Sequence, residues 1–408
     1  MPSIQIKNIA PLKDTGVVKL TPVMLLIGNQ SSGKSTLMKI LCFCRWIEKR
    51  IMVDGEDLLS KYTHYNRFRK ELLKFHRLSE TAFSDSSRIF YDGDCITIEL
   101  NGKNANAKII RKKNFAQDRY NLKISFIPSE RNLLSAINNI DKNYKAIDPD
   151  VLFNYILEWG EVRDSYKSSK PLNLAFEKNV SYYHDENAGD MLRLQREQKT
   201  IRTFYASSGI QSALPIMVMV DYIHNVVGTN GKRSPKDYIT AISRYLSANE
   251  DGGIDLTNEK LDSIKQLLTY KTAQLYIEEP EQNLFPKSQA ELVKNVIKKI
   301  KEASVKSNAF SAVMMTTHSP YVLTTLNQLL AASKAYEVDP QQTMLVMDEA
   351  YILPGSCYSA YRINDEGELE NLIDAETGLI MGEYLDSISE EVDEVMYRLN
   401  SIIYADVD

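Results

Sequence analysis

The sequence is poor in cysteine and lacks a long apolar run. Its 408 residues include four scattered cysteines (Cys42, Cys44, Cys95 and Cys357), too few for a disulfide framework and typical of a reducing compartment. The most apolar stretch, residues 213–220, is far shorter than the roughly 20 residues of a membrane-spanning helix. The N-terminus lacks a basic-then-apolar secretory pattern. We therefore expect a cytoplasmic protein with no membrane partner.

Neither sign of charge dominates the composition. The chain carries 49 basic and 54 acidic residues, and its formal net charge of −5 argues against a wholly basic coat for nucleic acids while allowing local patches. Hydrophobic residues make up 43% and charged residues 25%, which excludes a disordered or collagen-like chain. The length allows two or three domains, or one large domain. Composition therefore indicates a globular protein and leaves its function to the motifs.

A phosphate-binding loop is the strongest motif. Residues 28–35 match the pattern G-x-x-x-x-G-K-S/T, follow the apolar residues 24–27 and precede a helical pattern. Glycines let backbone N–H groups point at phosphate oxygens, Lys34 would bridge the β- and γ-phosphates of ATP, and the Ser35 hydroxyl would bind Mg²⁺. The expected nucleotide-binding residues of this loop are Gly28, Asn29, Gln30, Ser31, Ser32, Gly33, Lys34, Ser35 and Thr36.

Two adjacent carboxylates follow a second apolar strand. Residues 275–277 lead into Glu278 and Glu279. Such a strand end opens onto the ligand crevice of a parallel sheet, and consecutive side chains of a strand point to opposite sides. We expect Glu278 to hold Mg²⁺ through water and Glu279 to act as the general base of hydrolysis. His318 ends a third apolar strand, residues 313–316, where it could hydrogen-bond the γ-phosphate.

Small residues in front of a long apolar helix indicate a second anion site. Ser207, Ser208 and Gly209 would present N–H groups at the N-terminus of this helix, although the segment alone is also a good N-cap. One nucleotide does not need two such helix ends from the same subunit. The combination predicts a head-to-head homodimer, in which Ser207 and Gly209 of each subunit cover the ATP of the other.

In this order the motifs resemble the ABC-type ATPase heads of the SMC/RecF/OLD group, especially the prokaryotic AAA-annotated ATPases found in anti-phage defence systems. The chain departs from the family pattern at Glu278, where an aspartate is usual, and in its Ser-Ser-Gly-Ile-Gln signature. The resemblance covers residues 2–385. It implies the following roles: Walker A for residues 28–36, signature for 207–209, Walker B for Glu278 and catalytic Glu279, D-loop contact with the nucleotide for Asn283, and switch histidine for His318.

The resemblance also implies one ATPase head assembled from separate segments. We expect an α/β, ABC-ATPase-like P-loop fold: a mostly parallel core sheet with an antiparallel β subdomain and an inserted helical lobe. A further strand is expected at 343–347. Neither a coiled-coil arm nor a Toprim nuclease domain is indicated, because sustained heptads and the acid cluster of a nuclease are missing. The expected segments are a core lobe of residues 1–45, 86–130 and 270–408, a helical insertion of 46–85, and a helical and signature lobe of 131–269.

Three functions are compatible with the sequence. The leading hypothesis is an ATPase that dimerises around ATP and acts as a sensor or switch for a separately encoded effector, a nuclease or toxin, in anti-phage defence. A second is a RecF/SMC-like ATPase of DNA repair or recombination, which would bind DNA through basic and aromatic residues. A third is a largely non-hydrolysing scaffold that sequesters a toxin. The candidate DNA contacts are Tyr62, Tyr65, Arg67, Arg69, Lys70, Lys74, His76 and Arg77, and a second patch of Lys108, Arg111, Lys112 and Lys113.

Overall fold

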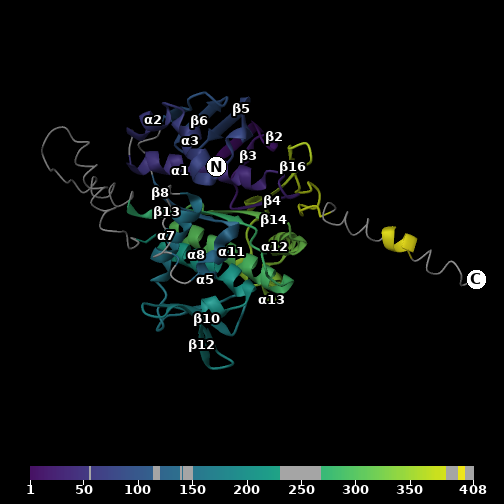
Figure 1. Ribbon diagram of the computed structural model, residues 1–408. Helices are drawn as coiled ribbons and strands as arrows, with labels where there is room; N and C mark the ends of the chain where they lie inside the picture. The colour runs from purple at the N-terminus through teal and green to yellow at the C-terminus, as the bar shows by residue number, and fades with distance from the viewer. Residues whose placement is uncertain are drawn as a thin grey trace, which may run out of the picture.

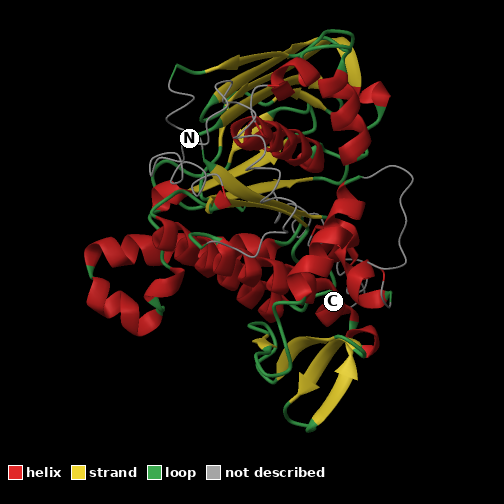
Figure 2. Ribbon diagram, turned by 90° about the vertical axis from the view of Figure 1, so that its left-hand side faces the viewer, coloured by secondary structure: helices red, strands yellow, loops and turns green. Residues whose placement is uncertain are grey.

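Layers of β-sheet and α-helix alternate through the molecule (Figure 1). The computed structural model describes residues 1–54, 57–113, 120–137, 140, 150–229, 268–382 and 394–399. From top to bottom in Figure 1, an antiparallel sheet is followed by a central sheet, a layer of helices and a four-stranded sheet. Figure 2 shows a long helix running between the first two sheets. This helix is α1 (Lys34–Asp54), and it packs against both of them.

The central sheet has the strand order β16-β15-β4-β14-β13-β8, and all of its strands except β16 run parallel. Strand β4 reads Val-Met-Leu-Leu-Ile-Gly and is buried throughout, as expected for a parallel strand covered on both faces. Its alternate residues serve two cores: Leu25 and Ile27 face the helix layer, whereas Met24 and Leu26 face α1. The strands are β4 (Val23–Gly28), β8 (Asn121–Ile127), β13 (Tyr270–Glu278), β14 (Ala312–Thr317), β15 (Tyr358–Ile363) and β16 (Leu369–Asn371).

The antiparallel sheet covers the outer face of α1. Alternating apolar residues of its strands, such as Ile89 and Tyr91 of β5, point into the core shared with this helix. Two helices, α2 (Asp57–Tyr62) and α3 (Arg67–His76), lie between α1 and β5 in sequence and complete this lobe. The strands are β1 (Ser3–Ile9), β2 (Leu12–Asp14), β3 (Val18–Lys19), β5 (Phe83–Asp92), β6 (Ile96–Asn101) and β7 (Lys108–Arg111).

Helices cover the other face of the central sheet and separate it from the four-stranded sheet (Figures 1 and 2). The longest apolar helix, α8, is almost completely buried from Ser212 to Val220, because it is packed between the sheet and other helices. The helices are α5 (Leu133–Ala136), α7 (Val151–Arg163), α8 (Ser208–Val226), α11 (Pro286–Ser307), α12 (Pro320–Val338) and α13 (Pro340–Val346). The four-stranded sheet contains β9 (Leu172–Asn173), β10 (Val180–Asp185), β11 (Gly189–Leu194) and β12 (Lys199–Arg202).

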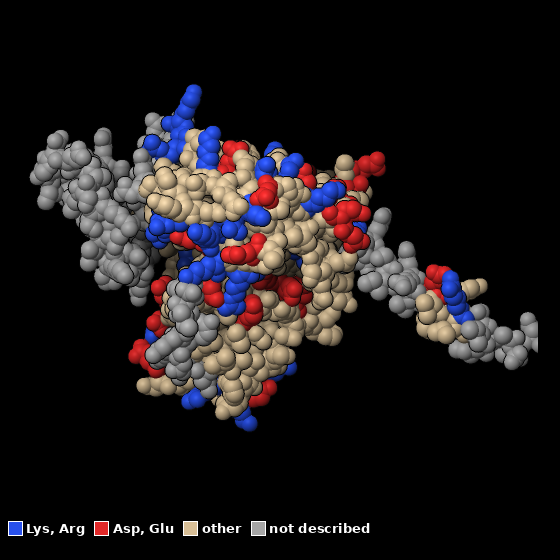
Figure 3. Space-filling model, turned by 45° about the horizontal axis from the view of Figure 1, so that its top comes forward, with Lys and Arg blue, Asp and Glu red and all other residues tan. Residues whose placement is uncertain are grey.

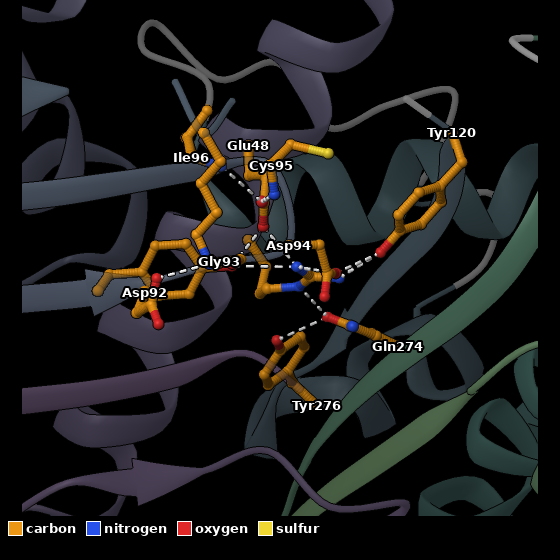
Figure 4. A network of polar contacts seen from close by, with 12 residues as sticks. Glu48, Asp92, Gly93, Asp94, Cys95, Ile96, Tyr120, Gln274 and Tyr276 are labelled. Atoms are coloured by element: carbon orange, nitrogen blue, oxygen red, sulfur yellow. Dashed lines mark hydrogen bonds and ion pairs between the residues drawn. The ribbon is translucent and has the colours of Figure 1, made fainter. Parts of the chain in front are cut away.

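A buried polar network joins α1 to the antiparallel sheet and to β13 (Figure 4). Its centre is the buried Arg45, whose Nη1 donates to Glu48 Oε2 at 2.5 Å and to Asp94 Oδ2 at 2.9 Å. Arg45 Nε donates to Gln274 Oε1 at 2.9 Å, and Gln274 belongs to β13. The hydroxyl of Tyr120 accepts from Arg45 and donates to Asp94. Three elements that are distant in sequence are therefore held by one guanidinium group.

The predicted fold class is confirmed: a mostly parallel core sheet, an antiparallel β subdomain and inserted helices are all present. The strand expected at 343–347 is wrong, because Pro340 starts helix α13 there and Asp339 caps it by accepting from Gln342 N at 3.0 Å. The lobe boundaries stay predictions, and residues 230–267 of the expected signature lobe lie outside the described residues.

Candidate active site

The motifs singled out in the sequence converge on the carboxyl edge of the central sheet. The strand register places Glu278 of β13 beside Thr316 of β14, and Thr317 of β14 beside Ile27 of β4. The phosphate-binding loop directly follows β4, and His318 directly follows β14. Three neighbouring strands therefore bring the loop, the two carboxylates and the histidine to one edge.

The phosphate-binding loop is wound so tightly that its two framing glycines cannot be replaced without displacing other atoms. Gly28 has a φ of 150° and Gly33 a φ of 110°. A Cβ on Gly33 would lie 2.7 Å from Leu12 Cδ2, and one on Gly28 would lie 2.9 Å from Ser32 Oγ. This Ser32 hydroxyl is buried and has no hydrogen-bond partner among the described residues. A narrow backbone cradle with an unsatisfied hydroxyl fits a phosphate group.

Lys34, the first residue of α1, is folded onto its own loop. Its Nζ donates to Gly28 O at 2.8 Å and to Asn29 O at 2.7 Å. Burial lowers the pKa of Lys34 from 10.5 to about 8, and the charges of Glu279 and Glu281 oppose this shift. The lysine is therefore desolvated and lies within electrostatic range of the carboxylates that follow β13.

Glu278, the last residue of β13, is buried next to α1. Its Oε2 accepts from Ser129 N at 3.2 Å, and its Oε1 lies 3.9 Å from Lys39 Nζ. Lys39 is four residues after Ser35 on α1, so the two side chains share one face of the helix. The helix face that carries Ser35 is thus turned toward the end of β13. Mg²⁺ commonly binds one or two carboxylates together with substrate phosphates, and Ser35 and Glu278 are oxygen donors of that kind.

Glu279 has an unusual backbone and a partly exposed side chain. Its φ is 44°, and its N–H donates to Thr316 O at 3.0 Å. One carboxylate oxygen accepts from Gln282 Nε2 at 3.0 Å, and the other lies 3.7 Å from His318 Nε2. Burial and the charge of Lys34 lower the pKa of His318, whereas Glu279 raises it. The expected general base and the expected switch histidine therefore lie next to each other.

Glu281 is a third carboxylate at this site, and the sequence analysis gave it no role. Its Oε1 accepts from His318 N at 2.8 Å and so fixes the backbone of the loop that carries the histidine. Its Oε2 is buried and lacks a hydrogen-bond partner in the described part of the chain. Burial raises the pKa of Glu281, although hydrogen bonds from His318 and Thr317 oppose the shift. The sequence signal for this third carboxylate is its place in Glu-Glu-Pro-Glu, two residues after Glu279.

The predicted signature segment forms the exposed start of helix α8. Ser207 is the N-cap, and its hydroxyl accepts from Ile210 N at 3.5 Å. A Cβ on Gly209 would lie 2.8 Å from Asn283 O, so the helix start and the predicted D-loop are in close contact. Asn283 Nδ2 also donates to Ser212 Oγ at 2.9 Å. Gly209 and Asn283 therefore lie in contact close to the carboxylates that follow β13 in the same chain, and Ser207 caps the same helix start.

The sequence alone indicates no role for Arg131, although this residue contacts both the carboxylate residues after β13 and the start of α8. It lies in the short 3₁₀ helix after β8, is 0% exposed, and donates to the carbonyl oxygens of Glu278, Glu279 and Ser212. Its neighbour Glu130 is exposed, and Glu130 Oε1 lies 3.9 Å from Arg77 Nη1.

Two hollows adjoin the central sheet. An open cleft of about 430 Å³ lies beside the carboxyl edge, between the 3₁₀ helix and the predicted D-loop. A larger hollow of about 970 Å³ lies at the amino ends of β13 and β14, on the opposite edge. The open cleft at the carboxyl edge is lined by Ser129, Glu130, Asn132, Leu133, Gln282 and Asn283.

Within the described ranges, no group of three His, Cys, Asp or Glu side chains could hold a metal ion. No helix of these ranges is long and apolar enough to cross a bilayer.

Comparison with models of protein families gives no match, and neither does comparison with curated proteins. Among solved structures, the SMC head domain from Thermotoga maritima is 11% identical over 90% of this chain and 97% of its own, with a TM-score of 0.36. The Pyrococcus furiosus Smc head domain, bound to the C-terminal domain of ScpA, is 11% identical over 96% and 100%, with a TM-score of 0.38.

The recombination mediator RecF is 12% identical over 91% of this chain and 97% of its own, with a TM-score of 0.32. These similarities are distant. The motif-bearing strands follow the order β4, β8, β13 and β14 along the sequence, whereas they lie in the order β4-β14-β13-β8 in the central sheet. In fold, the chain is an α/β protein with a mostly parallel central sheet and a phosphate-binding loop at the carboxyl edge of that sheet.

Proposed function

We propose that the protein binds and hydrolyses ATP at the carboxyl edge of the central sheet. The observation that carries this proposal is the position of Glu279. Its carboxylate lies 3.7 Å from His318 Nε2, and its charge acts on Lys34 of the phosphate-binding loop. A carboxylate beside a phosphate cradle can orient and deprotonate an attacking water. His318 would then hydrogen-bond the γ-phosphate.

The phosphates of ATP would be held by residues 28–36 and Mg²⁺ by Ser35 and Glu278, the latter through water. Mg²⁺ supplies charge stabilisation for the transferred phosphoryl group when bound. Lys39 Nζ lies 3.9 Å from Glu278 Oε1, so a cationic side chain is within ion-pair distance of that carboxylate. The tight turns at Gly28 and Gly33 and the unpartnered Ser32 hydroxyl support the phosphate assignment.

The proposed active form is a head-to-head homodimer or a higher assembly built from it. The start of α8 is exposed at Ser207, so it is accessible to the nucleotide of a second copy. Large aromatic side chains flank it at the surface: Tyr205 is 70% exposed and Phe285 is 78% exposed. Exposed aromatic residues beside polar contacts are typical of protein interfaces. Asn283, which packs against the same helix start, would contact nucleotide at the interface.

The dimer is proposed to act as a sensor or switch for a separately encoded effector, a nuclease or toxin, in anti-phage defence. This finer assignment rests on the resemblance of the motifs to ATPases of such systems. Isolation of the protein from its native host with the partners that bind it in the ATP state tests the assignment. Recovery of a nuclease or toxin with the ATP-bound form would support it, and a partner of another class would contradict it.

A DNA-binding ATPase is the second candidate, and basic residues around α3 favour it. Arg67 and Lys70 of α3 are exposed, and Figure 3 shows Lys and Arg interspersed with Asp and Glu over the upper part of the molecule. His76 and Tyr62 cannot contribute as predicted, because both are buried in the core shared with α1. Burial lowers the pKa of His76 to about 3.

Other members of the predicted DNA patches have acidic partners. Arg77 contacts Asp150 at 2.7 Å, and Lys112 contacts Asp92 at 2.7 Å. Duplex DNA binding that weakens steeply with salt would favour this candidate, since each phosphate contact releases counterions. Absence of binding at low salt would exclude it.

Two substitutions test the ATPase proposal. Lys34→Ala should abolish nucleotide binding, whereas Glu279→Gln should retain it, trap the ATP dimer and lower the hydrolysis rate by about 100-fold or more. Exposed Lys19→Ala is the matched control for lysine removal. Steady-state phosphate release separates hydrolysis from the non-hydrolysing scaffold. Unchanged turnover in Glu279→Gln would refute the catalytic assignment.

A further inference from the structure

Arg131 occupies a position that a charged side chain reaches only with complete hydrogen bonding. It is 0% exposed and lies between the ends of β8 and β13 and the first turns of α8. Burial lowers the pKa of Arg131, while nearby carboxylates raise it. A buried guanidinium is costly unless its donors are satisfied. The contacts of this guanidinium therefore offset the cost of burying it.

The guanidinium joins two segments through backbone carbonyls. Nη1 donates to Glu278 O at 2.6 Å and Nη2 donates to Glu279 O at 2.6 Å, so the fork spans the two carboxylate residues. Nε donates to Ser212 O of α8 at 2.9 Å. Lysine could not reproduce this arrangement, because only arginine presents several donors in a rigid plane.

Two further contacts fasten the same segments. Asn283 Nδ2 donates to Ser212 Oγ at 2.9 Å. The backbone of Gly209 approaches Asn283 O so closely that a Cβ would lie 2.8 Å from it. The start of α8 and residues 278–283 are therefore held together at several points. A shift of one segment must be followed by the other.

We propose that Arg131 is a positioning residue that couples the two nucleotide sites of the dimer. The proposal rests on the function proposed above, in which α8 of one subunit covers the partner's nucleotide while Glu279 acts on its own. Contact of α8 with the partner's nucleotide moves or fixes its first turns. Arg131 transmits this position to the carbonyl groups of Glu278 and Glu279, and so to the catalytic carboxylate. Occupancy of one site thereby sets the geometry of the other.

The test compares Arg131→Lys with the wild-type full-length protein. Hydrolysis is measured as a function of ATP concentration, and nucleotide affinity is measured with a fluorescent ATP analogue. We expect cooperative hydrolysis in the wild type, with a Hill coefficient that approaches about 2 for two coupled sites. In Arg131→Lys we expect kcat to fall by about tenfold or more and the Hill coefficient to fall to about 1. The nucleotide affinity of the subunit should stay within about twofold, because the phosphate-binding loop is untouched.

Controls separate coupling from a general loss of structure. Arg163→Lys changes another buried arginine, which lies on α7 and contacts Asp190, so its Hill coefficient should remain that of the wild type. Ser212→Ala removes only the bond to Asn283 and should lower the Hill coefficient in the same direction but less. If Arg131→Lys does not fold, Ser212→Ala decides the question.

The outcomes are distinct. A wild-type Hill coefficient and kcat in Arg131→Lys, or in Ser212→Ala when the arginine variant is unfolded, would overturn the coupling proposal. A parallel fall of kcat and nucleotide affinity together with the melting temperature would assign Arg131 a purely structural role. Absence of hydrolysis in the wild type, or of an ATP dimer in Glu279→Gln, would instead overturn the function on which the proposal rests.

Discussion

Glu48 is a buried carboxylate in the polar network around Arg45 (Figure 4). Its replacement by glutamine should strongly destabilise the lobe formed by the antiparallel sheet, α1, α2 and α3. Glu48 Oε2 accepts from Arg45 Nη1 and from Tyr91 OH, both at 2.5 Å. Oε1 accepts from Cys95 N at 2.6 Å and from Ile96 N at 3.3 Å. The carboxylate therefore accepts from four donors and has no contact with solvent.

Glutamine can accept with only one of its two terminal atoms. In either orientation its NH₂ group faces two donors, so two buried donors lose their acceptor. Each loss costs about 1–3 kcal/mol, and Arg45 also loses a charge partner. Asp94, 2.9 Å from Arg45 Nη1, still neutralises the guanidinium. The total loss of stability should therefore lie at the lower end of the range for a broken buried ion pair. We expect the free energy of unfolding to fall by about 3 kcal/mol.

The assay can be made local to α1. The chain has two tryptophans, Trp46 and Trp159, so a Trp159→Phe background leaves a single reporter next to Arg45. Urea unfolding followed by Trp46 fluorescence then gives the change for Glu48→Gln. Glu80→Gln, an exposed acid of the same lobe, should stay within about 0.5 kcal/mol of the parent. If Glu48→Gln matched this control, the view of Glu48 as a buried anion would be refuted.

Three further predictions concern the site itself. ATP affinity should fall by about fivefold between pH 8 and pH 9, because the pKa of Lys34 is about 8 and the neutral amine no longer attracts phosphate. Lys34→Arg should remove this dependence in titrations with labelled ATP. Gly33→Ala should abolish ATP binding, because the new Cβ would lie 2.7 Å from Leu12 Cδ2 and the backbone φ is 110°. Gly355→Ala is the control: no atom lies within 4 Å of its Cβ, so this variant should bind ATP normally. Burial raises the pKa of Glu281, so its ionisation opposes folding as the pH rises above 4.5. The melting temperature of Glu281→Gln should therefore exceed that of the wild type at pH 8, and the two melting temperatures should converge at pH 4.

The parts of the site that the sequence predicted are those encoded by contiguous residues. The phosphate-binding loop has a fixed spacing and lies between an apolar strand and a helix, so its residues and its place in the fold follow from local pattern alone. Glu278 and Glu279 were found in the same way, because they end an apolar strand. These assignments needed no information on distant contacts.

The residues that escaped the sequence analysis have their partners far away along the chain. Arg131 is 81 positions from Ser212, and Arg45 is 229 positions from Gln274, so neither pair forms a local motif. His76 was misassigned for the opposite reason. Local sequence places it in a basic, aromatic stripe, but tertiary packing turns it into the core next to Phe43 and Phe126. A short apolar run such as 343–347 has no decisive period, and the cap at Asp339 made it a helix.

Two arginines hold strand β13, Arg45 in its middle and Arg131 at its carboxyl end. Gln274, four residues before Glu278, accepts from Arg45, and the carbonyl of Glu278 accepts from Arg131. The strand is also hydrogen-bonded to β8 on one edge and β14 on the other, so it cannot slip without breaking both ladders. Contacts from the antiparallel sheet and from α8 therefore converge on one strand, which ends next to Glu279.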